Sequence, residues 1–250
     1  IIVPAVFIDR PELAGHLEQA VTAGAQVVVA GPTGVVDTGA GAVLGGYLGA
    51  LRPLLGVRVT DHAALTGPVG QSDPRGALVS RLSRAVGTPG SETWVGLEAV
   101  SESLRRVLDR MGTPAPDLRA GGWAEEVRID AGSNEAPQDA QAGQDRGAVE
   151  VVAVFDGRGG GADLAGRPAI TRRVAEGAGA GWYVAADLDA LSRAALLTLV
   201  CAHARVRPVV TDLPDGVEAQ RRGPVLFLLN HADRAAEVAG VVGTDLLSGE

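Results

Sequence analysis

The chain of 250 residues contains no lysine, so arginine supplies all 22 of its positive side-chain charges. A phosphate-binding loop of the P-loop type, a Schiff-base nucleophile and a pyridoxal anchor all need a lysine side chain. These enzyme classes are therefore excluded. The basic residues also form no stripe along the sequence, and the formal net charge is -8, so we expect no nucleic-acid partner.

Cysteine, aromatic residues and long apolar runs are equally scarce. Cys201 is the single cysteine, which excludes an internal disulfide and any metal site built from several cysteines. A single thiol suits a reducing compartment, so we expect a cytoplasmic protein. Glycine, proline or a charge interrupts every apolar run well short of the roughly 20 residues that cross a bilayer, and we expect no membrane contact. The N-terminal segment Ile-Ile-Val-Pro resembles the end of a buried strand, which indicates a fragment.

The first thirty residues predict a strand, a helix and a second strand. Residues 1–8 are apolar, Asp9 is placed to cap a helix, and Pro11 suits a first helical turn. Apolar side chains then recur at helical spacing until Gly24, and residues 26–30 form a short apolar run. This βαβ pattern predicts a parallel sheet.

Further elements are expected along the rest of the chain. Helices are predicted at 73–87, at 91–111 with Ser91 as the cap, and at 189–204. Strands are predicted at 149–155, 169–174 and 182–186, and residues 130–147 lack large apolar side chains and predict a mobile loop. Beyond residue 206 only short strands are expected, at 208–211, 217–220, 225–230 and 236–242. We therefore expect one domain over residues 1–205 and a second over 206–250.

Two features invite an assignment as ligand-binding or catalytic sites. A glycine cluster could bind a phosphate through its backbone N–H groups. The dinucleotide-binding motif Gly-x-Gly-x-x-Gly needs a third glycine, however, and Leu44 occupies that position. A structural turn is therefore favoured. The members of the cluster are Gly39, Gly41, Gly45, Gly46 and Gly49. Cys201 could be a nucleophile, but its neighbours predict a regular helix and not a tight elbow, which favours a buried place in the core.

The histidines and carboxylates do not indicate a metal site or a catalytic site. His16, His62, His203 and His231 are scattered, and surface or capping roles are expected. Asn134-Glu135 resembles a glycosidase acid/base dipeptide, yet it lies in a polar stretch with no strand to hold it. The pairs Glu125 with Glu126, Asp187 with Asp189, and Asp212 with Asp215 are interpreted as solvated charges at turns or strand ends. We expect no catalytic residue, cofactor site or metal site in this chain.

The aromatic residues are too few for a sugar-binding platform. Trp94 falls on the predicted helix 91–111, whereas Trp182 and Tyr183 alternate on a predicted strand, where only one of the two can face outward. A core or interface role is favoured for them.

Two groups of segments carry a family resemblance. The first lies within residues 30–59 and contains Gly34-Val35-Val36-Asp37, Gly45-Gly46-Tyr47 and Leu51-Arg52-Pro53-Leu54-Leu55-Gly56-Val57. The second comprises the segments 164–171, 179–188, 216–222, 227–231 and 243–249, in the same order. Together they resemble the trimerisation domain and the small C-terminal domain of the family-42 glycoside hydrolases, which are β-galactosidases. The chain departs from that family at residues 61–120 and 131–148.

The resemblance implies an α/β fold with an amidotransferase-like (flavodoxin-like) sheet and flanking helices, followed by a small antiparallel β domain. It further implies a homotrimer, with a catalytic barrel that precedes Ile1 and bears both catalytic glutamates of a retaining hydrolase. On this hypothesis the chain is a non-catalytic assembly region. The alternative is an independent module that binds a sugar or small molecule near residues 31–46, beyond the C-terminal end of a strand.

Overall fold

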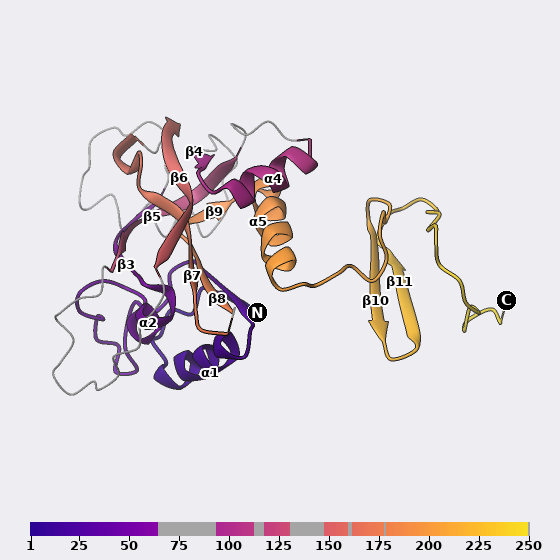
Figure 1. The fold of residues 1–250 in the computed structure, drawn as a ribbon, viewed down its shortest axis with the longest axis horizontal. Coiled ribbons are helices and arrows are strands. Elements are labelled where there is room, and N and C mark those ends of the chain that lie inside the picture. Colours follow the sequence, from indigo (N-terminus) through magenta and orange to yellow (C-terminus); the bar gives the residue numbers. More distant parts are fainter. Residues whose placement is uncertain (65–93, 113–117, 131–147, 160–161, 178, 250) are drawn as a thin grey trace. The chain divides into compact units, whose positions relative to one another are not determined.

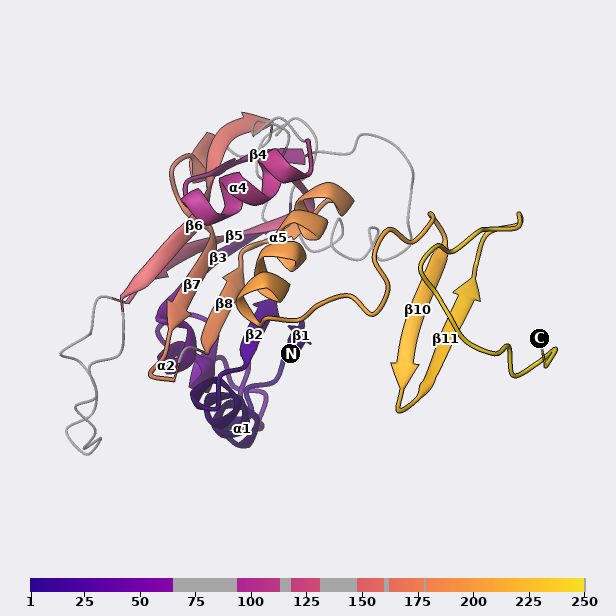
Figure 2. The ribbon, with the colours of Figure 1, turned by 45° about the vertical axis from the view of Figure 1, so that its right-hand side comes forward.

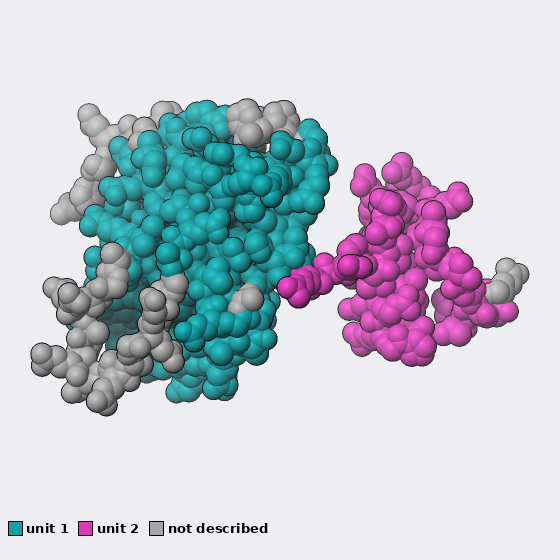
Figure 3. All heavy atoms as spheres, viewed as in Figure 1, with its two compact units in different colours: residues 1–204 teal, residues 205–250 magenta. Residues whose placement is uncertain are grey.

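The computed structural model describes residues 1–64, 94–112, 118–130, 148–159, 162–177 and 179–249. Contacts divide the chain into two compact units, Ile1–Ala204 (unit 1) and Arg205–Glu250 (unit 2), coloured separately in Figure 3. Each unit is considered by itself. The predicted helix 73–87 and the predicted loop with Asn134-Glu135 lie outside the described residues.

Unit 1 begins with the predicted βαβ arrangement. Strand β1 (Ile2–Pro4) pairs in parallel with β2 (Gln26–Ala30), and α1 (Pro11–Thr22) connects them. Helix α1 starts with its proline, which lacks the N–H that a first helical turn leaves unbonded. It ends just before Gly24, whose φ of 100° continues no helix. Its buried side chains are Ala14, Leu17 and Val21.

The remaining elements of unit 1 extend one mixed sheet. They are the 3-10 helix η1 (Gly49–Leu51), α2 (Arg52–Leu55), β3 (Val57–Ala64), β4 (Trp94–Ala99), α4 (Glu102–Arg110), β5 (Arg119–Ile129), β6 (Val149–Gly159), the 3-10 helix η3 (Ala162–Leu164), β7 (Pro168–Val174), β8 (Ala180–Val184), β9 (Ala186–Leu188) and α5 (Ala190–His203). The strand order is β1-β2-β8-β7-β6-β4-β5-β3, with β9 paired to β5. Strands β1, β2 and β8 are parallel, and the other pairs are antiparallel.

Helices cover both faces of the sheet at β8 (Figures 1 and 2). Gly181 lies against Leu54 and Leu55 of α2 on one face. The next residue, Trp182, points to the other face and meets His203 of α5, with ring centroids 5.6 Å apart. Both Trp182 and Tyr183 are consequently buried. The core role favoured for these two residues is thus confirmed, because helices cover the sheet on both faces here.

The predicted helix 91–111 is also wrong in its first half. Residues 94–99 form the strand β4, and the helix α4 starts only at Glu102. The side-chain oxygen of Ser101 caps α4 by accepting a hydrogen bond from the Leu104 N–H at 3.3 Å. The apolar residues at helical spacing also satisfy strand alternation over so short a run, with Val95, Leu97 and Ala99 all buried.

Unit 2 contains the antiparallel pair β10 (Val217–Arg222) and β11 (Val225–Asn230), with Val217 opposite Asn230. The two other strands expected here, at 208–211 and 236–242, do not form. Every side chain described in residues 205–249 is at least partly exposed. Unit 2 therefore has no enclosed core of its own among these residues.

Candidate functional site

The connection between β2 and β3, residues 31–56, leaves the C-terminal end of a parallel strand. In open α/β sheets, this edge is where functional surfaces are commonly built. The connection includes η1 and α2, and much of the family resemblance lies in it. We name residues 31–56 the crossover loop.

Arg52 holds one turn of the crossover loop in place. Its Nε donates to the Tyr47 carbonyl at 3.1 Å, and its NH2 group donates to the carbonyls of Leu44, at 2.9 Å, and of Gly46. A guanidinium presents its donors in a rigid planar fork, so one side chain satisfies three neighbouring carbonyls. The turn is thereby fixed without a ligand.

Two glycines let the crossover loop approach other backbone closely. Gly46 has a φ of 109°, and a Cβ there would lie 2.5 Å from the Val59 carbonyl oxygen. Gly34 has a φ of 59°, and a Cβ there would lie 2.7 Å from the carbonyl carbon of Leu48. Both positions therefore require glycine for packing. This outcome agrees with the structural-turn interpretation of the glycine cluster.

Two carboxylates bind backbone groups of this region. Asp37 Oδ1 accepts hydrogen bonds from the N–H groups of Gly39 and Gly41, both at 2.8 Å. Asp9 was expected to cap α1, but the residue at that cap is Arg10, which makes no side-chain bond there. The Asp9 carboxylate instead accepts from the Ala50 N–H at 3.0 Å. It thus joins the start of the chain to η1.

A small hollow lies beside Asp9. Its empty space is about 190 Å³ at most, because this volume includes open solvent, and its lining includes Val6, Ile8, Asp9, Leu13, Thr33 and Leu51. Pockets that bind small molecules usually enclose about 300–1,000 Å³. The hollow is therefore small for a sugar, which counts against the alternative of a sugar-binding module at this edge.

A buried polar cluster lies elsewhere in unit 1, and the sequence did not predict it. Glu125 is 1% exposed, its carboxyl group accepts a hydrogen bond from the Tyr183 hydroxyl, and His62 Nδ1 lies 3.3 Å from its other oxygen. Burial, and then the nearby Glu125 carboxylate, raise the pKa of Tyr183 well above its usual value. The interpretation of Glu125 as a solvated charge is therefore wrong. The hydrogen bond between Glu125 and Tyr183 joins β5 to β8.

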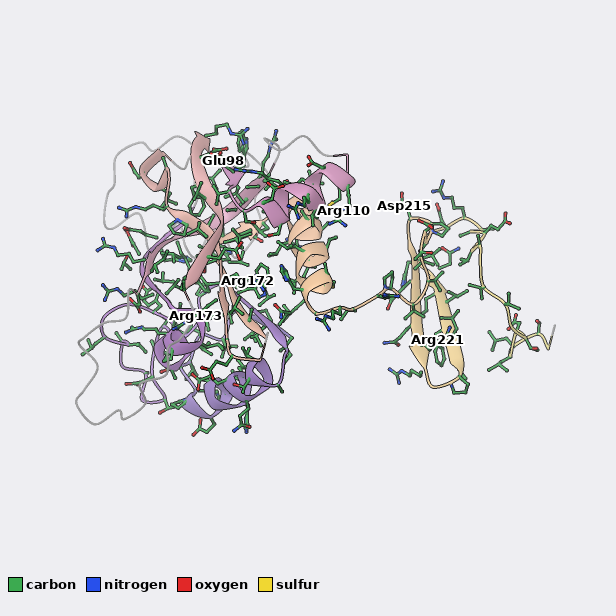
Figure 4. The ribbon with its side chains drawn as sticks, viewed as in Figure 1. Glu98, Arg110, Arg172, Arg173, Asp215 and Arg221 are labelled. Carbon is green, nitrogen blue, oxygen red and sulfur yellow. The ribbon has the colours of Figure 1, made fainter. Side chains whose placement is uncertain are left out.

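A second polar group lies on the opposite face of β8. The Arg172 guanidinium stands 5.3 Å from the centre of the Trp182 ring, and the Trp182 Nε1–H donates to Gln26 Oε1 at 2.9 Å. Figure 4 shows Arg172 and Arg173 on β7. Partial burial, and then the Arg172 charge, lower the pKa of His203. The neutral imidazole can thus pack against the Trp182 ring.

The other residues singled out in the sequence are scattered. Cys201 lies in α5 as expected, but its side chain is exposed, so its predicted place in the core is wrong. Asp189 caps α5 through a 2.8 Å bond from the Ser192 N–H, and is not merely a solvated charge. His231 lies 3.3 Å from Glu218 in unit 2. Among the described residues no group of three or more His, Cys, Asp or Glu side chains could hold a metal ion. No described helix is long and apolar enough to span a membrane.

The fold defines unit 1 as a mixed α/β domain with a large mixed sheet, and unit 2 as a small antiparallel sheet. Residues 1–72 match the family model of the β-galactosidase trimerisation domain. The entire chain is 30% identical to a β-galactosidase of Arthrobacter sp, of which it covers 27%. The predicted resemblance to the family-42 enzymes is thus confirmed, and the chain spans only about a quarter of this relative.

Solved structures share the fold. A cold-adapted β-galactosidase from Rahnella sp. R3 superposes with a TM-score of 0.64 at 21% identity, over 92% of this chain and 27% of that one. Gan42B, a family-42 β-galactosidase of G. stearothermophilus, superposes with a TM-score of 0.66 at 18% identity, over 100% of this chain and 28% of that one. At these identities the likeness concerns the fold alone.

Proposed function

We propose that these 250 residues are the assembly region of a β-galactosidase that hydrolyses terminal β-D-galactosides. One observation carries this proposal most directly: the trimerisation family model matches residues 1–72, where the crossover loop lies. The 30% identity to a β-galactosidase over the whole chain supports the nature of the parent. The role of this region is to hold copies of the enzyme together.

The catalytic part of the parent lies outside these residues on this proposal. The chain covers 27% of its Arthrobacter relative, which leaves ample length for a catalytic barrel with its two glutamates. The buried Glu125 is unsuited to that role, because a substrate cannot reach a carboxyl group that is 1% exposed. The barrel is then a partner of unit 1 within the parent chain.

The domain assignment is part of the same proposal. Residues 1–205 form the trimerisation domain, whose parallel strands β1, β2 and β8, covered by helices on both faces, support a relationship to the amidotransferase-like folds. Residues 206–250 form the C-terminal β domain. The free thiol of Cys201 supports a reducing, cytoplasmic location.

Two measurements on the purified chain test the proposal. Sedimentation equilibrium should give the mass of three chains, and the chain should release no nitrophenol from nitrophenyl β-galactoside. A monomer at every concentration would exclude the assembly role. Hydrolysis that persists after removal of contaminating enzyme would exclude the non-catalytic role.

The alternative sugar-binding module has its own test. Titration calorimetry with galactose should show no binding, since the hollow beside Asp9 offers at most about 190 Å³, including space open to solvent. Saturable heat with galactose would favour the module instead.

A further inference from the structure

Among the described residues of unit 1, exposed apolar side chains concentrate near the N-terminus. Eight large apolar side chains are exposed in this part of the chain, and five of them lie within residues 1–64, inside the segment 1–72 matched by the trimerisation model. The five are Ile1, Ile2, Phe7, Ile8 and Leu44, and the other three are Met111, Ile129 and Val174. Leu44 is the most exposed of the eight, at 87%. Apolar groups gathered at a surface commonly mark a site of protein contact.

Three of these side chains belong to chain segments that backbone hydrogen bonds connect. The Phe7 carbonyl accepts a hydrogen bond from the Val35 N–H at 2.9 Å, and Ile8 forms a bridge with Val36. The Val43 N–H in turn donates to the Val35 carbonyl at 3.1 Å, directly before Leu44. Segments 7–8, 35–36 and 42–44 are therefore adjacent. We use the name apolar patch for the exposed side chains that these neighbouring segments carry, Phe7, Ile8 and Leu44.

The backbone beneath the apolar patch is held firmly. Arg52 binds the Leu44 carbonyl at 2.9 Å, and the Tyr47 N–H donates to the Val59 carbonyl at 2.9 Å. A surface that is already ordered loses little conformational entropy when it binds. An exposed leucine on a fixed turn is thus well suited to make a contact.

Pairing through the edge strand β1 is a poorer explanation of how copies meet. Strand β1 lies at the edge of the sheet, and its residues 1, 3 and 5 face β2, as the bonds from Val28 to Ile1 and from Ala5 to Ala30 show. Its outward positions are Ile2 and Pro4, and proline has no N–H to offer a neighbouring strand. Side-chain packing at the apolar patch is the better candidate.

We infer that the apolar patch contacts a second copy of this chain. The inference rests on the proposed assembly function, and it adds the surface that performs it. The occupant follows from the match between residues 1–72 and a trimerisation model, because that segment contains all three residues of the apolar patch. In a closed cyclic trimer every copy uses the same surfaces, so one substitution alters all three contacts.

The test replaces apolar patch residues with charge in the 250-residue chain. Leu44→Glu, alone and together with Phe7→Glu, should convert the trimer to monomers in light scattering at equal concentrations. Met111→Glu is the matched control, because Met111 is an exposed apolar residue of unit 1 outside residues 1–72. It should remain trimeric.

Each outcome of this test has a distinct meaning. A trimeric Leu44→Glu chain overturns the inference and leaves the assembly function intact, whereas a monomeric wild-type chain overturns the assembly function itself. Thermal unfolding shows whether a variant is folded. Should Leu44→Glu fail to fold, Leu44→Cys in a Cys201→Ser background replaces it. Its thiol should react with a maleimide at least tenfold more slowly than Met111→Cys in that background, and equal rates overturn the inference.

Discussion

The Tyr183 hydroxyl donates a hydrogen bond to the carboxyl group of Glu125 in the interior of unit 1, across 58 residues of sequence. This bond joins β8 to β5, and the close approach of His62 Nδ1, at 3.3 Å, adds β3 to the connection. Each of the two bonded side chains is 1% exposed. The pair therefore ties together strands that the sheet order separates.

Replacing Tyr183 with phenylalanine should destabilise unit 1. The substitution keeps the ring but leaves a buried carboxyl group without its hydroxyl partner, which typically costs about 1–3 kcal/mol. Urea unfolding measures the loss. Tyr47→Phe is the control, because Tyr47 is only half-buried and should cost less. Equal free energies of unfolding for wild type and Tyr183→Phe would contradict the structural role of the bond.

The raised pKa of Tyr183 predicts a loss of stability at high pH. Below pH about 10 the phenol is protonated in both the folded and the unfolded chain, so its contribution is fully present. As the pH rises further, the unfolded chain releases this proton while the folded chain retains it, and stability falls. Unfolding at pH 8 and pH 11 should show a smaller decrease for Tyr183→Phe than for wild type. An identical decrease in both would contradict this linkage.

The cap of α5 should contribute more to stability than the nearby exposed ion pair of Asp187. Asp189→Ala removes the acceptor for the Ser192 N–H and should lower the free energy of unfolding by about 0.5–2 kcal/mol. Asp187→Ala removes only an exposed ion pair with Arg193, at 3.6 Å, which is typically worth about 0–1 kcal/mol. Urea unfolding of both variants makes the comparison. A larger loss for Asp187→Ala would contradict the assigned cap.

Unit 2 should open more readily than unit 1. The pair β10–β11 contains no fully buried side chain, and an isolated two-stranded sheet is marginally stable in water. Amide hydrogen exchange on the chain should therefore be faster in residues 217–230 than in β2 and β8, which lie inside the large sheet. Equal protection in the two units would show that unit 2 gains support from a further contact.

The sequence predicted those elements whose signals are local. Proline at the start of α1 and glycine after it are local signals, and the helices predicted there and at 189–204 are confirmed. The prediction of a helix at residues 94–99 is wrong because the apolar residues there fit helical and strand spacing equally well. The predicted burial of Cys201 is wrong because it rested on the usual burial of cysteine, whereas Cys201 lies on the exposed side of α5 with Thr198.

The polar cluster and the fixed crossover loop could not be predicted, since both depend on distant partners. Glu125 meets Tyr183 from another strand, and no spacing rule relates the two residues. Nothing in the local sequence indicates that Arg52 binds the carbonyls of Leu44, Gly46 and Tyr47. The family resemblance located the segment but not these bonds.

Light scattering of the wild-type chain over a hundredfold dilution tests the central claim most directly. An assembly region should show the mass of three chains at the higher concentrations and, if it dissociates, fall toward one chain on dilution. The same monomeric mass at every concentration would contradict the account.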